Sequence, residues 1–204
     1  MPLKFYFSPM SSAEVTRAVL AELEHGQGGP LAETINVKIT EGEAKTDQFL
    51  AEVNPNGLVP VIVHDGVTIW ESAAITMYLG ETFGVDRKVD GVSAPLFPEP
   101  GTRRGEAMKW IVWPNLHLAA HTLALYDAKA LESRARADIK KSLGVLNGAL
   151  EGREYLLGEY TLADTHVWSF VSYMAMLKFD LSETPNVDAW FKRVSSRPQL
   201  KALD

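Results

Sequence analysis

The hydrophobic pattern of the sequence changes partway along the chain. Up to about residue 84, strand-like runs alternate with helix-like segments, whereas beyond about residue 102 only helical periodicity remains. Residues 85–102 show no periodicity and hold four prolines or glycines between Pro95 and Gly101. We therefore predict an α/β domain over residues 1–84, a linker over 85–102 and an all-helical domain over 103–204.

The first domain is predicted to have the element order β-α-β-α-β-β-α. Its strands and helices are expected at Leu3–Phe7, from Ser11 to about residue 25, along Ile35, Val37 and Ile39, and at 43–52, 59–63, Val67–Trp70 and 71–83. Ser11 and Glu14 match an N-terminal capping box for the first helix. That helix makes the strands on either side of it a parallel pair with a right-handed crossover. The turn Asp65-Gly66 favours an antiparallel hairpin of the last two strands.

The second domain is predicted to be a helical bundle. Its helices are expected at residues 103–127, 133–150, 162–177 and 187–195. Pro114 should kink the first of them, because proline lacks the backbone N–H that a helix interior uses. Thr161 and Asp164 form a second capping box, for which we expect a folding role and no part in chemistry.

The composition limits the classes of partner. A net charge of −6 and an isoelectric point near 5.4 argue against a nucleic-acid backbone, because that partner requires clusters of basic residues. No apolar run approaches the roughly 18 residues of a membrane span. The first residues also lack the long apolar stretch and cleavage site of a signal peptide. We therefore expect a cytoplasmic location, with no nucleic-acid or membrane partner.

The chain contains no cysteine. Its absence excludes disulfides, thiolate metal sites and every mechanism in which the protein supplies the sulfur nucleophile. Any thiol chemistry must therefore use a thiol carried by a small molecule. His117 and His121 have the spacing of a helical metal pair, but no glutamate-rich motif accompanies them. We predict a packing or substrate-pocket role for these histidines and no metal site.

Three motifs in order along the chain carry a resemblance. They are Phe-Tyr-Phe-Ser-Pro-Met-Ser-Ser at residues 5–12, Asn-Pro-Asn-Gly-Leu-Val-Pro-Val at 54–61 and Thr-Leu-Ala-Asp at 161–164. With the element order and the helix start Glu71-Ser72, the whole chain resembles the cytosolic glutathione transferase family, in particular its bacterial serine-type members. The resemblance implies a thioredoxin-like domain that binds glutathione, a helical domain that shapes the pocket for an electrophile, and a homodimer.

Two adjacent serines are the candidates for activating the thiol of glutathione. A free thiol with a pKa near 8.5 is only about 3% ionised at neutral pH. A hydroxyl at a helix N-terminus favours the thiolate through a charge-assisted hydrogen bond and through the helix dipole. The resemblance assigns this role to Ser11, with Ser12 as the alternative because some bacterial members carry cysteine at the matching position. Ser11 as a simple helix cap is the structural alternative, and Tyr6, which matches an early tyrosine of another branch, is more typical of a core residue.

The remaining site residues come from the resemblance as well. It implies a cis peptide bond between Val59 and Pro60, with the backbone N–H and C=O of Val59 directed at the cysteinyl unit of glutathione. Ser72 would bind the γ-glutamyl carboxylate through its hydroxyl and N–H, and Glu71 would face the amino group. Both residues also suit ordinary helix capping.

The chain departs from the family at one contact. Many relatives place lysine, glutamine or histidine just before the Val-Pro pair, where the side chain touches the glycyl end of glutathione. This chain has Gly57-Leu58 there, so the contact is either missing or supplied from elsewhere, with Lys45 as the candidate.

The resemblance also predicts the pocket and the reaction. Met10, Trp113 and His117 are expected to line the electrophile site. The predicted reaction is conjugation of glutathione, as co-substrate, to a small hydrophobic electrophile in detoxification, without a further cofactor. Two alternatives remain open: a non-catalytic ligand-binding protein of the same fold, and a glutathione-dependent lyase, isomerase or peroxidase.

Overall fold

A computed structural model describes residues 3–88, 94–122 and 129–203. The elements in chain order are β1 (Leu3–Phe7), α1 (Ala13–Glu24), β2 (Ala32–Asn36), the 3-10 turns η1 (Ile39–Glu41) and η2 (Glu43–Lys45), α2 (Asp47–Glu52), β3 (Val61–His64), β4 (Val67–Trp70), α3 (Ser72–Leu79), the π-helical turn η3 (Gly80–Gly84), α4 (Thr102–His117), α6 (Lys129–Ala149), α7 (Leu162–Met176), α8 (Pro185–Ser195) and α9 (Pro198–Lys201).

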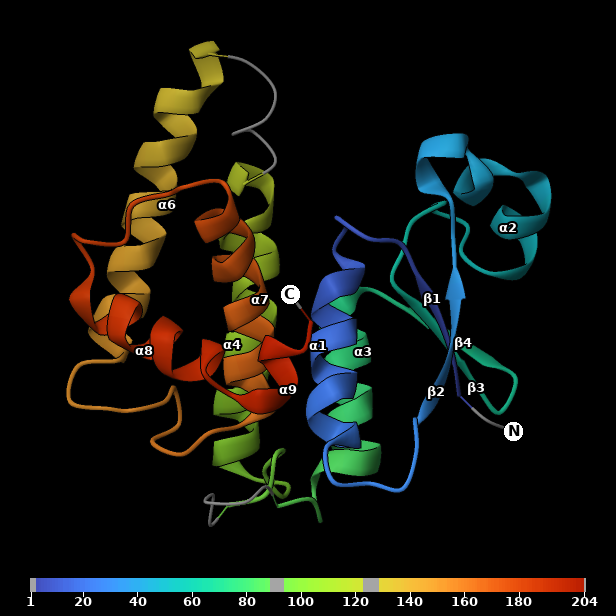
Figure 1. Cartoon of the computed structure of the whole chain (residues 1–204), viewed down its shortest axis with the longest axis horizontal. Coiled ribbons are helices and arrows are strands. Elements are labelled where there is room, and N and C mark those ends of the chain that lie inside the picture. Colours follow the sequence, from blue (N-terminus) through green and yellow to red (C-terminus); the bar gives the residue numbers. More distant parts are fainter. Residues whose placement is uncertain (1–2, 89–93, 123–128, 204) are drawn as a thin grey trace.

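The first half contains a four-stranded sheet with the strand order β2-β1-β3-β4. β1 pairs with β2 in parallel, and β3 pairs with both β1 and β4 in antiparallel fashion. Asp65 and Gly66 turn the hairpin with φ angles of 49° and 81°, which an Asp-Gly pair tolerates. The thioredoxin-like arrangement predicted from the sequence is therefore confirmed. Figure 1 shows α1 and α3 between this sheet and the helical half.

The second strand ends earlier than its alternation indicates. The predicted strand along Ile35, Val37 and Ile39 is wrong in its bounds, because β2 ends at Asn36 and Ile39 already begins η1. β1 ends at Phe7, and the Val37 N–H closes the ladder by donating to Phe7 O at 2.7 Å. Beyond that bond, β1 offers no further backbone for β2 to pair with.

The predicted capping box at the start of α1 is also wrong. The helix begins at Ala13 with Ser12 at the N-cap, and the Ser12 side chain makes no capping hydrogen bond. Ser11 Oγ accepts from the Ala13 N–H at 3.1 Å, but the Glu14 N–H donates to Ser11 O, so the reciprocal side-chain bonds of a capping box are not formed. Ser12 is itself helical, with φ of −62° and ψ of −7°, whereas a capping residue needs an extended backbone to reach the helix N–H groups. The Glu14 carboxylate instead pairs with Arg17, at 2.6 Å between Oε2 and Nε.

Two other predicted helices are interrupted. The segment 43–52 divides at Thr46, whose backbone is extended and whose hydroxyl caps α2 by accepting from the Phe49 N–H at 3.3 Å. The segment 71–83 is regular only to Leu79 and then widens into η3. A Cβ at Gly80 would lie 2.6 Å from the Phe97 ring, so glycine is required where the following segment crosses.

The second half consists of helices over its described residues. The predicted helices 133–150, 162–177 and 187–195 correspond to α6, α7 and α8, and the capping box of Thr161 and Asp164 is confirmed. α9 was not indicated by periodicity, since it has only four residues.

The first of these helices differs from the prediction. The predicted helix 103–127 is broken, because α4 ends at His117 and Leu118 adopts φ of −116° before residues 119–122 become helical again. Pro114 lies in the last turn of α4, where its missing N–H weakens the helix. The predicted end at 123–127 lies outside the described residues.

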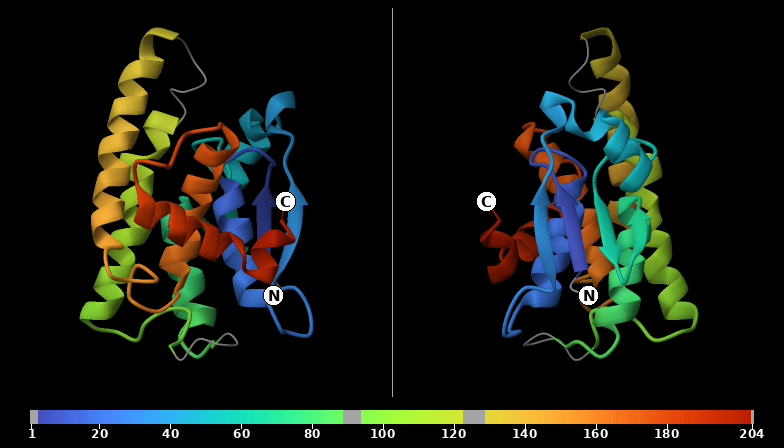
Figure 2. Two further views of the ribbon diagram at one scale, coloured as in Figure 1. Left: turned by 60° about the vertical axis from the view of Figure 1, so that its left-hand side comes forward. Right: turned by 90° about the vertical axis from the view of Figure 1, so that its right-hand side faces the viewer.

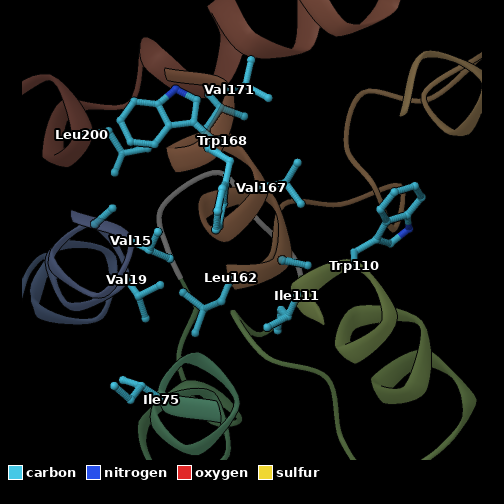
Figure 3. Packing of buried hydrophobic residues seen from close by; sticks show 14 of the residues in the cluster. Val15, Val19, Ile75, Trp110, Ile111, Leu162, Val167, Trp168, Val171 and Leu200 are labelled. Atoms are coloured by element: carbon cyan, nitrogen blue, oxygen red, sulfur yellow. The ribbon is translucent and has the colours of Figure 1, made fainter. Parts of the chain in front are cut away.

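The two halves share one apolar core. α7 packs against α1 and α4, and α3 packs against α1 and α4; α6 lies on the outer flank, away from the sheet (Figures 1 and 2). Figure 3 shows buried side chains of these helices pointing toward one another, among them Val15 and Val19 of α1, Ile75 of α3, Ile111 of α4 and Val167 of α7. Burial of each such side chain contributes roughly 1.5–3 kcal/mol. This shared core fixes the loops of the first half against the helices of the second.

Candidate functional site

The strand pairing brings three loops to one edge of the sheet. Tyr6 of β1 lies opposite Val61 of β3, and Val61 lies opposite Trp70 of β4. Because both pairings are antiparallel, the residues after β1, those before β3 and those after β4 meet at the same edge. The predicted residues Ser11 and Ser12, Val59 and Pro60, and Glu71 and Ser72 belong to these three loops.

The two serines differ in what holds their hydroxyl groups. Ser11 Oγ donates to Ser8 O at 2.6 Å and accepts from the Ala13 N–H at 3.1 Å, so local backbone occupies it as donor and acceptor. Ser12 Oγ donates to Val59 O at 3.0 Å. Ser12 is exposed at the N-terminus of α1. Its hydroxyl therefore joins the start of the helix to the entry of β3.

The peptide bond between Val59 and Pro60 is cis, as the resemblance implied. The preceding loop is held from inside by Asn54, a buried residue whose Nδ2 donates to Leu58 O at 2.9 Å. Leu58 itself is apolar and 56% exposed. The Leu58 carbonyl is thus used within the loop, and the Leu58 side chain offers no polar group to a ligand.

Gly57 explains how Lys45 approaches this loop. Gly57 has φ of 62°, and a Cβ there would lie 2.7 Å from Ala44 O and 2.8 Å from Lys45 Nζ. The Lys45 ammonium donates to Asn56 O at 3.0 Å. A cation from η2 therefore lies beside the residues that precede Val59.

Glu71 and Ser72 form the junction between β4 and α3. Glu71 is exposed and adopts φ of 73° with ψ of 118°, a sparsely populated conformation that costs a non-glycine residue roughly 1–3 kcal/mol. Ser72 is buried, and its Oγ accepts from Asn115 Nδ2 of α4 at 2.9 Å. Since Glu71 holds the N-cap position, Ser72 is not the cap of α3.

A cavity of about 340 Å³ opens beside Ser12. It lies between the start of α1, the loop before β3 and the helical half, and its walls come from both halves. The lining residues are Met10, Ser11, Ser12, Glu14, Val15, Ile39, Gly57, Leu58, Val59, Ala119, Thr122, Ser169, Phe170 and Tyr173. The volume is in the range of small-molecule sites.

The predicted pocket residues separate in the structure. Met10 lines the cavity, but Trp113 and His117 are not among its described lining residues. The Trp113 ring packs between Trp110 and His117, with centroid distances of 5.4 and 5.9 Å. The helical wall is instead built by residues that the sequence analysis missed, namely Ala119, Thr122, Ser169, Phe170 and Tyr173. Their helical spacing is the sequence signal that they carry. Because core residues show the same spacing, it does not distinguish pocket residues from core residues.

The helical wall presents mainly apolar surface. The hydroxyls of Thr122 and Ser169 donate back to their own helices, to Leu118 O at 2.7 Å and to Thr165 O at 3.0 Å. Glu14 brings a carboxylate to the rim, and its ion pair with Arg17 opposes the repulsion that it would exert on an anion near Ser12. The cavity therefore suits an apolar body with an anionic group at the α1 end.

Neither a metal cluster nor a membrane helix is found in the part of the chain that the structure describes. Among the described side chains, those of residues 3–88, 94–122 and 135–203, no three acidic or histidine groups are placed so that they could hold a metal ion. His117 contacts Trp113, whereas His121 pairs with Asp138 at 3.7 Å. Over the same described ranges, no helix has the length and apolar character needed to cross a bilayer.

Comparisons with known proteins identify the family of the chain. The family model for the N-terminal domain of glutathione S-transferase matches residues 1–81, and that for the C-terminal domain matches residues 106–198. The chain is 31% identical to glutathione S-transferase D7 of Drosophila melanogaster over 169 residues, which cover 76% of this chain and 69% of that protein. It is also 31% identical to glutathione S-transferase 2 of Schizosaccharomyces pombe over 201 residues, which cover 83% and 82%.

Solved structures share the fold. A possible glutathione S-transferase from Rhodopseudomonas palustris is 27% identical, with a TM-score of 0.80 over 98% of this chain and 96% of that chain. The glutathione transferase URE2P6 from Phanerochaete chrysosporium, solved with oxidised glutathione, has a TM-score of 0.84 over 99% and 94%. At 24% identity this second likeness concerns the fold alone. The two family models and the two relatives at 31% identity place the chain in the cytosolic glutathione S-transferase family.

Proposed function

We propose that this glutathione S-transferase conjugates the thiolate of glutathione to a small hydrophobic electrophile, with Ser12 stabilising the thiolate. The observation that carries the proposal is the 3.0 Å hydrogen bond from Ser12 Oγ to Val59 O, at the mouth of the cavity. It supports a site in which a hydroxyl, a helix N-terminus and the backbone before β3 face one ligand.

The loops at the sheet edge would bind the rest of glutathione. The N–H and C=O of Val59 hold the cysteinyl unit by strand addition. Ser72, at the N-terminus of the eight-residue helix α3, binds the γ-glutamyl carboxylate, and the exposed Glu71 faces the amino group. Lys45, which lies beside Gly57, supplies the cation for the glycyl carboxylate.

The chemistry needs one hydroxyl to change its partner. When the amide N–H of glutathione donates to Val59 O, the Ser12 O–H turns from that oxygen to the sulfur, and the thiol proton passes to solvent. A charge-assisted hydrogen bond of roughly 1.5–3 kcal/mol lowers a thiol pKa by about one to two units. The sulfur lone pair then forms a bond to the electrophilic carbon, and the leaving group or opened ring takes the displaced electron pair.

The geometry favours Ser12, although the sequence alone favours Ser11. The Ser11 hydroxyl makes two hydrogen bonds that define the turn before α1, and a turn toward the ligand would break its donor bond to Ser8 O. The single bond of Ser12 goes to an atom that the ligand would itself occupy. Ser12 can therefore exchange one hydrogen-bond partner for another, whereas Ser11 would lose a hydrogen bond that holds the turn before α1.

We also propose the assembly and the boundaries that the sequence indicates. Exposed apolar side chains on β4 and α4, Val67, Trp70, Val112 and Leu116, support a homodimer. A cytoplasmic serine-type enzyme with domains at 1–84 and 103–204 fits the same proposal. Light scattering on the purified protein tests the dimer, and a monomer mass would contradict it.

A conjugation assay across pH tests the proposal, using wild type, Ser11→Ala and Ser12→Ala. We expect Ser12→Ala to lower kcat/KM at neutral pH by about 10- to 100-fold and to shift the apparent pKa upward. Ser11→Ala, the matched control, should keep the wild-type pKa. An unchanged profile for Ser12→Ala would contradict the assigned role.

The choice of electrophile tests the reaction class. A panel of aryl halides, isothiocyanates, epoxides and hydroperoxides should give conjugation of at least one apolar member. Turnover of hydroperoxides alone would indicate a peroxidase with the same thiolate site. Retention on immobilised glutathione without any turnover would indicate a non-catalytic binding protein.

A further inference from the structure

A chain of polar side chains runs from Ser72 into the interface between the two halves. Ser72 Oγ lies 2.9 Å from Asn115 Nδ2, Asn115 Oδ1 lies 2.9 Å from His166 Nε2, and His166 Nδ1 lies 2.9 Å from Thr76 Oγ1. Ser72 and Thr76 lie one turn apart on α3, Asn115 lies on α4 and His166 on α7. This series of side-chain hydrogen bonds thus begins on α3, passes through one residue on each of two helices of the second half and returns to α3.

The types of atom set the direction of each hydrogen bond. An amide nitrogen only donates, so Ser72 Oγ accepts from Asn115 and keeps its own proton for another partner. An amide oxygen only accepts, so His166 carries its proton on Nε2, and Nδ1 accepts from the Thr76 hydroxyl. Burial lowers the pKa of His166 to about 3, which keeps the ring neutral near pH 7 as this pattern requires.

We propose that Asn115, oriented by His166, is a positioning residue that directs the Ser72 hydroxyl proton toward the carboxylate of glutathione. The inference rests on the proposed role of Ser72 as the γ-glutamyl contact. Ser72 is buried and its oxygen already has a donor, so a ligand at the N-terminus of α3 meets a hydroxyl prepared to donate. The second half thereby takes part in glutathione binding without touching glutathione.

Replacement of Asn115 by aspartate separates this role from simple packing. Aspartate has the size of asparagine, but it accepts the Ser72 proton and places a negative charge behind the carboxylate site. A packing role predicts that Asn115→Asp is milder than Asn115→Ala, whereas a positioning role predicts the reverse. If the Asn115 amide had the opposite orientation, its oxygen would already accept the Ser72 proton. Asn115→Asp would then weaken glutathione binding less than Asn115→Ala does.

The experiment measures the glutathione Kd by calorimetry, together with KM and kcat at saturating electrophile. We expect Ser72→Ala to weaken glutathione binding by about 10- to 100-fold, Asn115→Ala by about 3- to 10-fold and Asn115→Asp by more than Asn115→Ala. For Asn115→Ala the loss should appear in KM for glutathione more than in kcat, since Asn115 acts on binding through Ser72 and is not assigned to the sulfur. In the Ser72→Ala background, Asn115→Ala should have no further effect.

The control is Asn147→Asp, the same change at a half-buried asparagine of α6 whose Oδ1 accepts from the Asn186 N–H. It should leave the Kd for glutathione unchanged. Circular dichroism identifies a variant that has not folded. If Asn115→Asp does not fold, the double-mutant cycle of Asn115→Ala with Ser72→Ala still tests whether Asn115 acts through Ser72.

Three results would overturn the inference. They are an aspartate variant that binds as well as or better than the alanine variant, a full effect of Asn115→Ala when Ser72 is already alanine, and wild-type binding that Ser72→Ala leaves unchanged. A wild-type protein that does not bind glutathione would overturn the proposed function itself and this inference with it.

Discussion

At the scale of single residues, the site depends on where hydroxyl protons are directed. Ser12 donates to a carbonyl that a peptide ligand would occupy, and Ser72 is held as an acceptor so that its own proton is available. Thr122 and Ser169 donate to their own helices and leave the cavity wall apolar. Hydroxyl groups that look equivalent in the sequence therefore have different roles in the fold.

His166 gives a prediction at this scale. Its pKa is about 3 in the fold and 6.5 in the unfolded chain, so between these values only the unfolded chain binds the proton. Stability therefore falls as the pH decreases below about 6.5, by about 1.4 kcal/mol per pH unit. His166→Gln does not titrate, so urea unfolding from pH 7.5 to 4.5 should show the wild type losing stability relative to the variant.

The comparison with His166→Gln also controls for Asp164. Burial raises the pKa of Asp164 to about 6, so this residue acts in the opposite sense and favours the fold as the pH falls below 6. Both proteins retain Asp164, and the difference between them isolates His166. A constant difference across this pH range would show that His166 is not buried as a neutral ring.

At the scale of elements, α7 is started by a single buried carboxylate. Asp164 accepts from the Thr161 N–H at 3.0 Å, the Leu156 N–H at 2.9 Å and the Trp190 Nε1–H at 3.0 Å. These bonds tie the helix start to the preceding loop and to α8. Because α7 supplies His166 and the cavity residue Phe170, the capping box positions the site indirectly.

Asp164→Ala should destabilise the protein by about 3–5 kcal/mol, because it leaves several buried donors without an acceptor. The midpoint of urea unfolding measures the loss. Asp180→Ala is the matched control, since Asp180 is exposed and accepts from the N–H and hydroxyl of Ser182 in its own turn, and it should cost far less. Equal losses in the two variants would contradict the structural role of the cap.

Local signals predicted those elements whose cause lies in adjacent residues. The Asp65-Gly66 turn and the Thr161–Asp164 box are specified by their own side chains, and both were predicted from the sequence. The end of β2 depends on where β1 stops, and the start of α1 on where the Ser12 hydroxyl finds a partner in Val59. Such distant partners are invisible to periodicity.

The candidate site divides in the same way. Val59 and Ser72 belong to sequence motifs, so both could be predicted as site residues from the sequence alone. Thr122 and Phe170 line the cavity only because α7 packs beside the segment that follows α4. Trp113 and His117 have equally suitable side chains, but the break at Leu118 separates them from that wall.

At the scale of the whole molecule, a buried ion pair holds the C-terminal segment on the first half. Glu22 of α1 is fully buried and accepts from Arg197 Nε and Nη2, both at 2.7 Å, from the Tyr160 hydroxyl at 2.7 Å and from Gln199 Nε2. The Arg197 guanidinium also lies 3.6 Å from the centroid of the Tyr160 ring. One carboxylate thus connects the first helix with three residues of the second half.

Arg197→Ala should cost about 3–5 kcal/mol of unfolding free energy, because it leaves the Glu22 carboxylate buried without its countercharge. The double variant Glu22→Gln/Arg197→Ala removes the charge as well and should recover part of that loss. Chemical denaturation of both variants measures the difference. A double variant less stable than Arg197→Ala would show that the carboxylate is not the source of the cost.

We propose that the hydroxyl of Ser12 ionises the thiol of bound glutathione. An ultraviolet difference titration of the enzyme–glutathione complex measures the pKa of that thiol directly. We predict a value about one to two units below the ordinary 8.5, which returns toward 8.5 in Ser12→Ala and stays low in Ser11→Ala. A bound thiol with an unshifted pKa, or a lowered pKa that survives Ser12→Ala, would contradict this role of Ser12.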